Sequence, residues 1–414
     1  MNSADDSLLR NVRFRRLWIG QGLSFVGDFV STVALVLLVV DMSGSASAVG
    51  GVLVARLLPT LASPLAGVLA DRLDRRVVLV AADLVRAVLV VGLIFARDLP
   101  MIYALAFLLG AARTVFNPTV RAAFPAVVGG GDLTRANALI SGTFSFSVMA
   151  GPALGGVLVA SVGVEMAFLL DALTFLVSAA LLSTIPLPAP GRDGAEEGFS
   201  GELRAGFGYL VGARVPLAIV AGAFLATLTA NAVIPAEAFL ARETFDAGDV
   251  GYGLLASLWG GGMILGSALT AVLAGSANLI LLYFVSIFAT ALAFVGVGLS
   301  PTFALALGAI MVAGTANGVD NVATDTVLQE RVPDAFLGRV FAARFMTFSA
   351  GEALAYPIGG LIVDAAGPRS TYLLAGAATA AAGVLVLLIL AAPLATAEND
   401  EQHMRWKEGG GCMK

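Results

Sequence analysis

Twelve hydrophobic segments, most of them about 20 to 27 residues long, fill nearly the whole chain. A bilayer core about 30 Å thick requires roughly 20 apolar residues per helix, because lipid offers backbone groups no hydrogen-bond partner. Only 13% of the residues are charged, too few to cover a soluble protein of 414 residues. The sequence therefore predicts an all-α membrane protein with twelve transmembrane helices. They are expected at 17–41, 47–70, 77–97, 100–121, 136–162, 164–187, 215–240, 248–274, 277–299, 302–327, 340–365 and 369–394.

The distribution of arginine predicts the orientation of these helices. Arginines gather before the first segment and in every second loop after it, whereas the opposite loops hold few. Cytoplasmic loops of membrane proteins carry an excess of Lys and Arg. We therefore expect a multi-pass protein of the inner (plasma) membrane, with both termini in the cytoplasm.

Composition excludes several classes of function. His403 is the only histidine and Cys412 the only cysteine, and both lie in the C-terminal tail. No lysine precedes Lys407, and no Gly-x-x-x-x-Gly-Lys nucleotide loop is present. We therefore expect no enzyme activity, no metal site, no cofactor and no ATP-driven pumping. A nucleic-acid partner is not expected either, because no basic patch with interleaved aromatic residues occurs.

The chain is predicted to consist of two related halves. Leu-Thr-Arg at 133–135 is echoed by Leu-Gly-Arg at 337–339, and Leu-Gly-Gly at 154–156 by Ile-Gly-Gly at 358–360, a spacing of about 204 residues. Parallel repeats of this kind place a substrate site at their interface near the middle of the bilayer. The expected parts are a six-helix bundle at 1–186, a Pro/Gly-rich cytoplasmic linker at 187–207, a second six-helix bundle at 208–394 and a cytoplasmic tail at 395–414.

The loop from Gly67 to Arg76 resembles the signature loop of the major facilitator superfamily, except that Asp74 stands where that family usually has glycine. The resemblance implies a conformational latch made by Gly67, Asp71, Arg75 and Arg76. Asp71 would contact the start of helix eleven, whose free N–H groups favour an anion, when the cytoplasmic side is shut. The alternative is that these charges only set the topology.

The Gly-Pro-Ala-Leu-Gly-Gly run at 151–156 resembles the antiporter motif of the superfamily. Further motifs across the chain resemble those of its macrolide and multidrug exporters. This resemblance implies a monomer that exports hydrophobic or amphipathic compounds by proton antiport, with alternating access and a cavity between helices 1, 2, 4, 5, 7, 8, 10 and 11. Its partners would be a small-molecule substrate, protons and membrane lipids. Siderophore or lysophospholipid transport is the alternative, and a nontransporting sensor or scaffold is a further one.

Charged residues inside the segments are the candidates for coupling. An ionisable side chain in the middle of a membrane helix costs roughly 2.5–3.5 kcal/mol, so it usually has a partner or a function. Asp28 and Arg56 lie near the centres of neighbouring segments, and we expect them to pair, either as a proton-coupling site or as a permanent structural ion pair. Glu352 is central and has no arginine within a turn, so it can carry a proton or meet a cationic substrate.

A polar stripe is predicted on the segment at 302–327. Asn317, Asn321 and Asp325 follow an i, i+4 spacing, and Asp320 lies close to them. We expect this stripe to line a water-filled cavity, with Asp320 and Asp325 as further candidates for proton coupling. Other residues proposed for the cavity or for substrate binding are Arg56, Arg113, Asp171, Asn231 and Trp259. Trp259 can either stack on a ligand or fill a groove between helices.

Three further charged residues lie within the predicted segments: Asp83, Arg86 and Glu237. Asp83 and Arg86 are three residues apart, so we expect them to pair with each other near the cytoplasmic interface. Glu237 can line the outer part of the cavity or lie at the membrane interface.

Overall fold

The computed structural model describes residues 5–63, 73–128, 132–187, 207–210, 212–273 and 278–391. Within these ranges the chain is helical and contains no strand. The first half holds α1 (Asp5–Arg10), α2 (Val12–Ser43), α3 (Ala46–Leu57), η1 (Leu58–Ala62), α5 (Arg75–Ile94), α6 (Leu99–Val128), α7 (Leu133–Val162) and α8 (Val164–Ser183). The second half holds α10 (Arg214–Ala232), α11 (Ile234–Phe239), η2 (Leu240–Thr244), α12 (Gly248–Leu273), α13 (Leu279–Leu299), α14 (Phe303–Arg331), α15 (Asp334–Ala366) and α16 (Pro368–Ala391).

Eleven spans in the described part of the chain are long and apolar enough to cross a membrane. They correspond to eleven of the twelve predicted segments. The segment predicted at 47–70 is described as the shorter apolar helix Ala46–Ala62, and residues 64–72 lie outside the described ranges. So do the predicted tail at 395–414 and all of the predicted linker except its two end residues.

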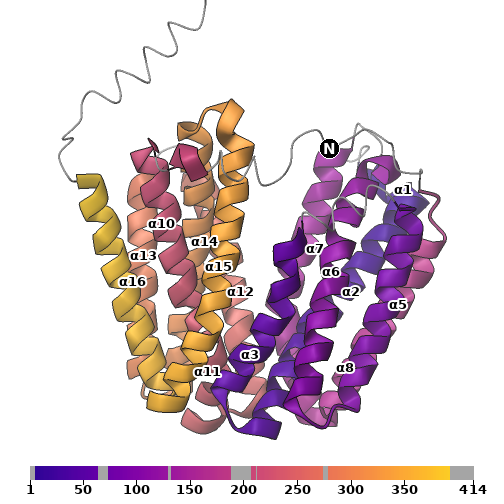
Figure 1. The fold of residues 1–414 in the computed structure, drawn as a ribbon, viewed down its shortest axis with the longest axis horizontal. Coiled ribbons are helices and arrows are strands. Elements are labelled where there is room, and N and C mark those ends of the chain that lie inside the picture. The colour runs from indigo at the N-terminus through magenta and orange to yellow at the C-terminus, as the bar shows by residue number, and fades with distance from the viewer. Residues whose placement is uncertain are drawn as a thin grey trace, which may run out of the picture.

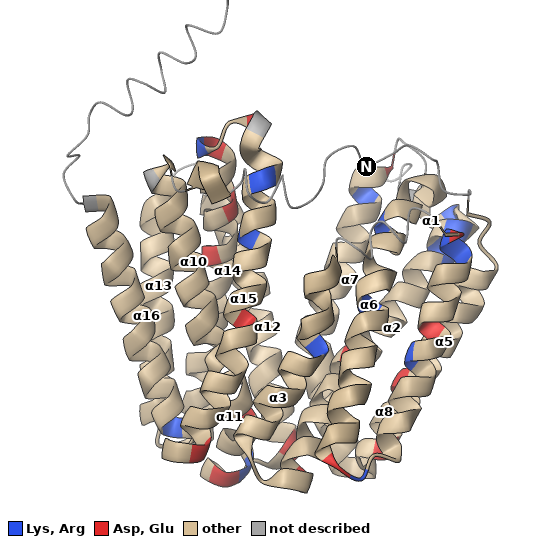
Figure 2. Cartoon of the chain, in the orientation of Figure 1, with Lys and Arg blue, Asp and Glu red and all other residues tan. Residues whose placement is uncertain are grey.

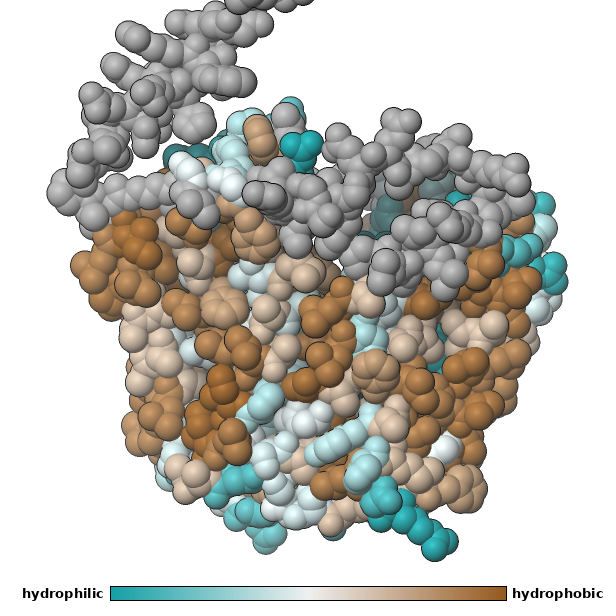
Figure 3. Space-filling model, viewed as in Figure 1, coloured by the Kyte–Doolittle hydropathy of each residue, from teal (hydrophilic) through white to brown (hydrophobic). Residues whose placement is uncertain are grey.

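Large hydrophobic side chains on the outer surface support a membrane location. Val88, Val272 and Leu292 are each more than 70% exposed. Figure 3 shows hydrophobic residues over the middle of this face and hydrophilic ones toward its ends. Figure 2 shows charged residues gathered mainly at the two ends of the helices, with few between them. This distribution is expected of a polytopic membrane protein, because apolar side chains are stable in contact with lipid whereas charged side chains are unfavourable there.

The helices form two bundles (Figure 1). In the first bundle α2 packs against α7 and α8, while α5 packs against α6 and α8. In the second bundle α14 packs against α12 and α13, and α10 packs against α15 and α16. The two bundles meet where α7 packs against α12 and where α3 packs against α15.

The internal repeat predicted from the sequence is visible in the backbone. Gly163 joins α7 to α8 with φ 87° and ψ 169°, and Gly367 joins α15 to α16 with φ 83° and ψ 167°. This left-handed region suits glycine because the residue has no Cβ. Gly156 of α7 lies against α12, and its counterpart Gly360 of α15 lies against α3. The two interfaces between the halves are therefore built on equivalent positions.

Helix seven, predicted as one segment at 215–240, is broken. The α-helix stops at Ala232, restarts as α11 at Ile234 with Pro235 in its first turn, and continues as a π-helical turn, η2. Proline cannot supply the N–H of a helix interior but is well tolerated at a helix start. Glu237 lies in α11, directly after this break.

Candidate functional site

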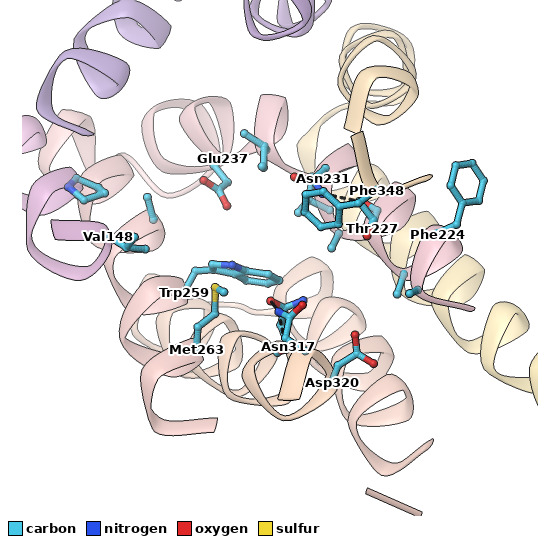
Figure 4. A pocket seen from close by; sticks show the side chains of 18 of the residues that line it. Val148, Phe224, Thr227, Asn231, Glu237, Trp259, Met263, Asn317, Asp320 and Phe348 are labelled. Atoms are coloured by element: carbon cyan, nitrogen blue, oxygen red, sulfur yellow. Dashed lines mark hydrogen bonds between the residues drawn. The ribbon is translucent and has the colours of Figure 1, made fainter. Parts of the chain in front are cut away.

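A cavity of about 520 Å³ lies between the two halves. Helices α2 and α7 contribute to it from the first half, and α10, α11, α12, α14 and α15 from the second. These are predicted helices one, five, seven, eight, ten and eleven, whereas no described residue of predicted helices two and four lines this cavity. Most of the lining is apolar or aromatic, including Phe29, Phe224, Trp259, Met263 and Phe348 (Figure 4). Such a surface suits an apolar ligand with a few polar groups.

Trp259 lies at the cavity wall in the middle of α12. Its ring stacks on Phe294 of α13, with centroids 6.0 Å apart and planes 13° apart. Its backbone packs closely against Gly314 of α14. Its backbone therefore belongs to a helix contact while its side chain lines the cavity, so stacking of the ring on a ligand stays a prediction.

The predicted polar stripe of α14 faces the cavity through Asn317, Asp320 and Asn321. The Asn321 side-chain amide donates to the backbone oxygen of Asn317 at 3.0 Å and to its side-chain oxygen at 3.1 Å. Asp320 is 9% exposed, and its Oδ1 has no hydrogen-bond partner among the described residues. Asn231, also predicted here, lines the cavity from α10. An unsatisfied buried carboxylate oxygen is costly, which makes Asp320 a candidate to meet a ligand or a proton.

Glu237 of α11 lines the same cavity and is 6% exposed. The first of the two alternatives for this residue therefore holds, because it is buried against the cavity and not placed at an exposed interface. The signal that could have found it is Ile234-Pro235, which breaks helix seven just before it.

Arg344 of α15 also lines the cavity, and the sequence analysis did not single it out. It pairs with Asp325 of α14, which is 44% exposed and lies outside the cavity lining. Asp325 forms an ion pair with Arg344, whereas Asp320 interacts with Arg344 only electrostatically.

The other predicted charges gather in an ionic cluster inside the first bundle. Arg56 Nη2 lies 3.4 Å from Asp28 Oδ1, so the expected contact is present. Arg56 Nη1 donates to Thr32 Oγ1 at 2.5 Å, and Thr32 itself lines the cavity. Arg86 Nη1 lies 4.0 Å from Asp28 Oδ2 and extends the cluster to α5.

Asp83 and Arg86 pair with each other, as expected, and both are buried inside the first bundle. Their side chains are 0% and 3% exposed. The Arg86 guanidinium also lies 4.1 Å from the ring centre of Phe116 and 4.4 Å from that of Phe175. Helices α6 and α8 cover this face of α5, which the sequence of α5 alone does not show.

Asp171 and Arg113 belong to the surroundings of this cluster rather than to the cavity lining. Asp171 of α8 is 1% exposed, accepts a hydrogen bond from Thr174 Oγ1 at 3.3 Å and interacts electrostatically with Asp28 and Arg56. Arg113 of α6 interacts electrostatically with Arg56 and with Glu352. Arg113 therefore interacts with charges of both halves.

Glu352 of α15 does not line the cavity. Its Oε1 accepts a hydrogen bond of 3.5 Å from the Tyr356 hydroxyl, and no ion pair to it is present within the described residues. The side chain is intermediate in exposure. A lightly partnered carboxylate on the helix that contacts α3 is placed to respond when the halves move.

The signature loop is only partly described. Gly67 and Asp71, two of the predicted latch residues, lie outside the described residues. Arg75 and Arg76 begin α5, where Asp74 Oδ1 accepts from the backbone N–H groups of Arg76 and Val77 at 2.9 and 3.2 Å. The departure from the family pattern at Asp74 therefore has a structural role, since aspartate is a good helix N-cap and glycine provides no side chain for it.

Polar contacts join the halves at the end of the molecule away from the N-terminus, here called the closed end. Asp364 of α15 accepts from the backbone N–H groups of Ala46 and Ser47 at 2.7 and 3.1 Å, and from Ser45 Oγ at 2.8 Å. These groups form the start of α3, whose dipole favours an anion. Arg242 of η2 bridges Asp41 of α2 and Asp249 of α12, each at 2.5 Å. In Figure 1 the two bundles diverge from the closed end toward the end that holds the N-terminus.

The whole chain is similar to known transporters. The family model described as transmembrane secretion effector matches residues 5–410. The enterobactin exporter EntS of Shigella boydii is 30% identical over 78% of each chain, and macrolide efflux protein A of Streptococcus pyogenes is 22% identical over 88% of this chain and 93% of its own. BacE of Bacillus subtilis, a proposed bacilysin exporter, is 33% identical over 41% of this chain, and the match spans only 43% of its length.

Solved structures agree on the fold. The nucleoside transporter NupG has a TM-score of 0.72 at 14% identity, covering 92% of this chain and all of its own. A bacterial homologue of the lysosomal transporter Spinster has a TM-score of 0.69 at 16% identity, covering 91% and 94%. With eleven spans in its described part, repeated halves, a central cavity and a family match over nearly its whole length, the chain belongs to the transmembrane secretion effector family of the major facilitator superfamily.

Proposed function

We propose that this protein is a secondary transporter that exports hydrophobic or amphipathic small molecules from the cell in exchange for protons. The observation that carries the proposal is the cavity between the halves, with its largely apolar and aromatic wall. Exporters of macrolides and of enterobactin among the similar proteins support an export direction.

The arrangement of the halves supports a mechanism of alternating access. With both termini in the cytoplasm, as the arginine distribution predicts, the closed end is the outer end and the arrangement is inward-facing. Opening toward the outside requires that Asp364 leave the start of α3 and that Arg242 release Asp41. Asp71, at the other end of the second predicted helix, would then contact the start of helix eleven, as the resemblance of its loop implies.

Proton coupling is proposed for carboxylates outside the cavity wall. Glu352 has one weak hydrogen bond, and Asp28 is shared by Arg56 and Arg86. Arg113 interacts electrostatically with Glu352 and with Arg56, so it can link the two candidates. Movement of α15 relative to the first bundle would change the charges that surround both of them.

A test of the transport site is a substitution that fills the cavity. Ala256 lines it from α12, whereas Ala268 of the same helix is exposed on its surface. In inverted membrane vesicles supplied with a panel of dyes, macrolides and lysophospholipids, the Ala256→Trp variant should lose at least 90% of the uptake by the wild type. Ala268→Trp is the matched control and should retain it. Equal uptake by both variants would show that substrates do not pass through this cavity.

A further inference from the structure

We infer that the cavity selects cationic amphipathic compounds and holds their cationic group between the carboxylate of Glu237 and the ring of Trp259. This inference rests on the exporter function proposed above and adds the charge of the substrate to it. Three features of the described residues carry it: an unpaired buried carboxylate, an aromatic face beside it, and an excess of negative charge in the cavity wall.

Glu237 is the first of these features. The side chain is 6% exposed, and no hydrogen bond or ion pair to it is present in the described part of the chain. Figure 4 shows its carboxylate pointing from α11 into the cavity, toward the side where Trp259 lies. A buried carboxylate without a partner is unfavourable, and a cation that enters the cavity restores the interaction that burial removes.

Trp259 provides the second feature. A cation over an aromatic ring gains electrostatic energy from the ring quadrupole, most of all over tryptophan. The stacking of Trp259 on Phe294 holds the plane of the indole against α13. A carboxylate and an indole face on one apolar cavity are together suited to an alkylated ammonium or a phosphonium, whose surface is partly apolar.

The charge balance of the cavity wall provides the third feature. Among the lining residues Glu237 and Asp320 are acidic and Arg344 is basic. Arg344 pairs with Asp325, which lies outside the lining, whereas Asp320 Oδ1 has no hydrogen-bond partner among the described residues. Arg344 also interacts electrostatically with Asp320. The cavity wall therefore carries two carboxylates and one arginine that is already paired outside the lining, an arrangement that attracts cations and opposes anions.

The two carboxylates lie at different depths. Glu237 follows the break in helix seven, and Figure 1 shows α11 at the closed end. Helix α14 runs from the closed end toward the end that holds the N-terminus, and Asp320 lies in its second half. A cationic group that enters from the divergent end would meet Asp320 first and Glu237 last.

The test uses probes of one shape and opposite charge. Full-length protein in lipid nanodiscs is titrated with tetraphenylphosphonium and with tetraphenylborate, and binding to protein-free discs is subtracted. The permanent charges ensure that neither probe can exchange a proton with the site. We expect the phosphonium to bind at least ten-fold more tightly than the borate. Equal affinities, or tighter binding of the borate, would overturn the inference.

Substitutions then locate the charge. Glu237→Gln keeps the volume and should weaken phosphonium binding at least ten-fold without weakening borate binding. Asp320→Asn should act in the same direction more weakly. Glu243→Gln is the matched control. Glu243 lies on η2, six residues after Glu237, but it is exposed and does not line the cavity. Phosphonium binding that survives both cavity substitutions would contradict the inference. Should Glu237→Gln fail to fold, Asp320→Asn remains as the test, and it should weaken phosphonium binding without weakening borate binding.

Failure of the inference can be told apart from failure of the proposed function by transport in inverted vesicles. Uptake of neutral amphipathic compounds without any preference for the phosphonium would refute the charge selection and leave the exporter function intact. Absence of uptake for neutral, cationic and anionic compounds alike would refute the proposed function itself.

Discussion

Asp28 and Arg56 show how a buried charge depends on its partner. Their side chains are 15% and 16% exposed, and Arg86 also lies within 4.0 Å of Asp28. Replacing either residue of the pair leaves a charge in low dielectric without compensation, which costs about 3–5 kcal/mol. Thermal unfolding in detergent should therefore occur at lower temperature in Asp28→Asn and in Arg56→Gln. The double variant should recover at least half of the loss. A double variant no more stable than the weaker single variant would show that the contact does not stabilise the protein.

The proposed role of Glu352 in proton coupling can be tested with a substitution that leaves its packing unchanged. Glu352→Gln keeps the side-chain volume and the acceptor for the Tyr356 hydroxyl, but it cannot exchange a proton. The variant should still bind substrate and allow downhill exchange. Uptake into inverted vesicles should lose its acceleration by an imposed pH gradient. If gradient-driven accumulation is unchanged, the proton is carried elsewhere, and Asp28 is the next residue to test.

At the scale of secondary structure, the contact between Asp364 and the start of α3 should set the balance between the two arrangements. Loss of an aspartate that accepts hydrogen bonds from a helix N-terminus costs about 1 kcal/mol, or about five-fold in an equilibrium constant. Asp364→Ala should therefore increase the population open at the closed end. Spin labels at Ser161 and Ala366, both exposed near that end, would report longer distances in a background where Cys412 is replaced by Ser.

The control for this substitution is Glu165→Ala. Glu165 is an exposed acid at the start of α8, close to the same end of the molecule. Its removal should leave the distance distribution unchanged. An unchanged distribution in Asp364→Ala as well would show that the contact with α3 does not hold the halves together.

The signature loop gives a second prediction at this scale. Asp71→Asn removes the charge that, by resemblance, contacts helix eleven when the cytoplasmic side is shut, but it keeps the shape of the side chain. Transport in vesicles should fall several-fold while the amount of protein in the membrane stays close to that of the wild type. Normal transport by well-folded Asp71→Asn protein would rule out the latch.

Helix positions were predictable from the sequence because each span of a bilayer needs about 20 mainly apolar residues in a helix. Eleven predicted segments correspond to described spans within several residues at each end. The break in helix seven was not predicted, since a proline such as Pro235 can either kink a helix or start a new one, depending on the packing around it. Because the break was not predicted, the sequence left two locations open for Glu237: the cavity wall and the membrane interface.

At the scale of the whole molecule, the sequence identified the charged residues but not their grouping. Asn231, Trp259, Asn317, Asp320 and Asn321 line the cavity, whereas Asp28, Arg56 and Asp171 gather inside the first bundle. Depth in the membrane can be read from position in a segment. The direction in which a side chain points depends on how the helix is rotated against its neighbours. Arg344 was missed for this reason, because its pairing with Asp325 joins two helices.

The central claim is that movement of the two halves exchanges a small molecule for protons. Its most direct test follows substrate uptake and lumenal pH together in sealed inverted vesicles, with a pH-sensitive dye trapped inside. The account predicts that adding a transported substrate makes the lumen more alkaline in proportion to uptake, and that vesicles carrying Glu352→Gln show uptake without this change. Uptake by the wild type with no change in lumenal pH would contradict proton exchange, and so would a lumen that becomes more acidic.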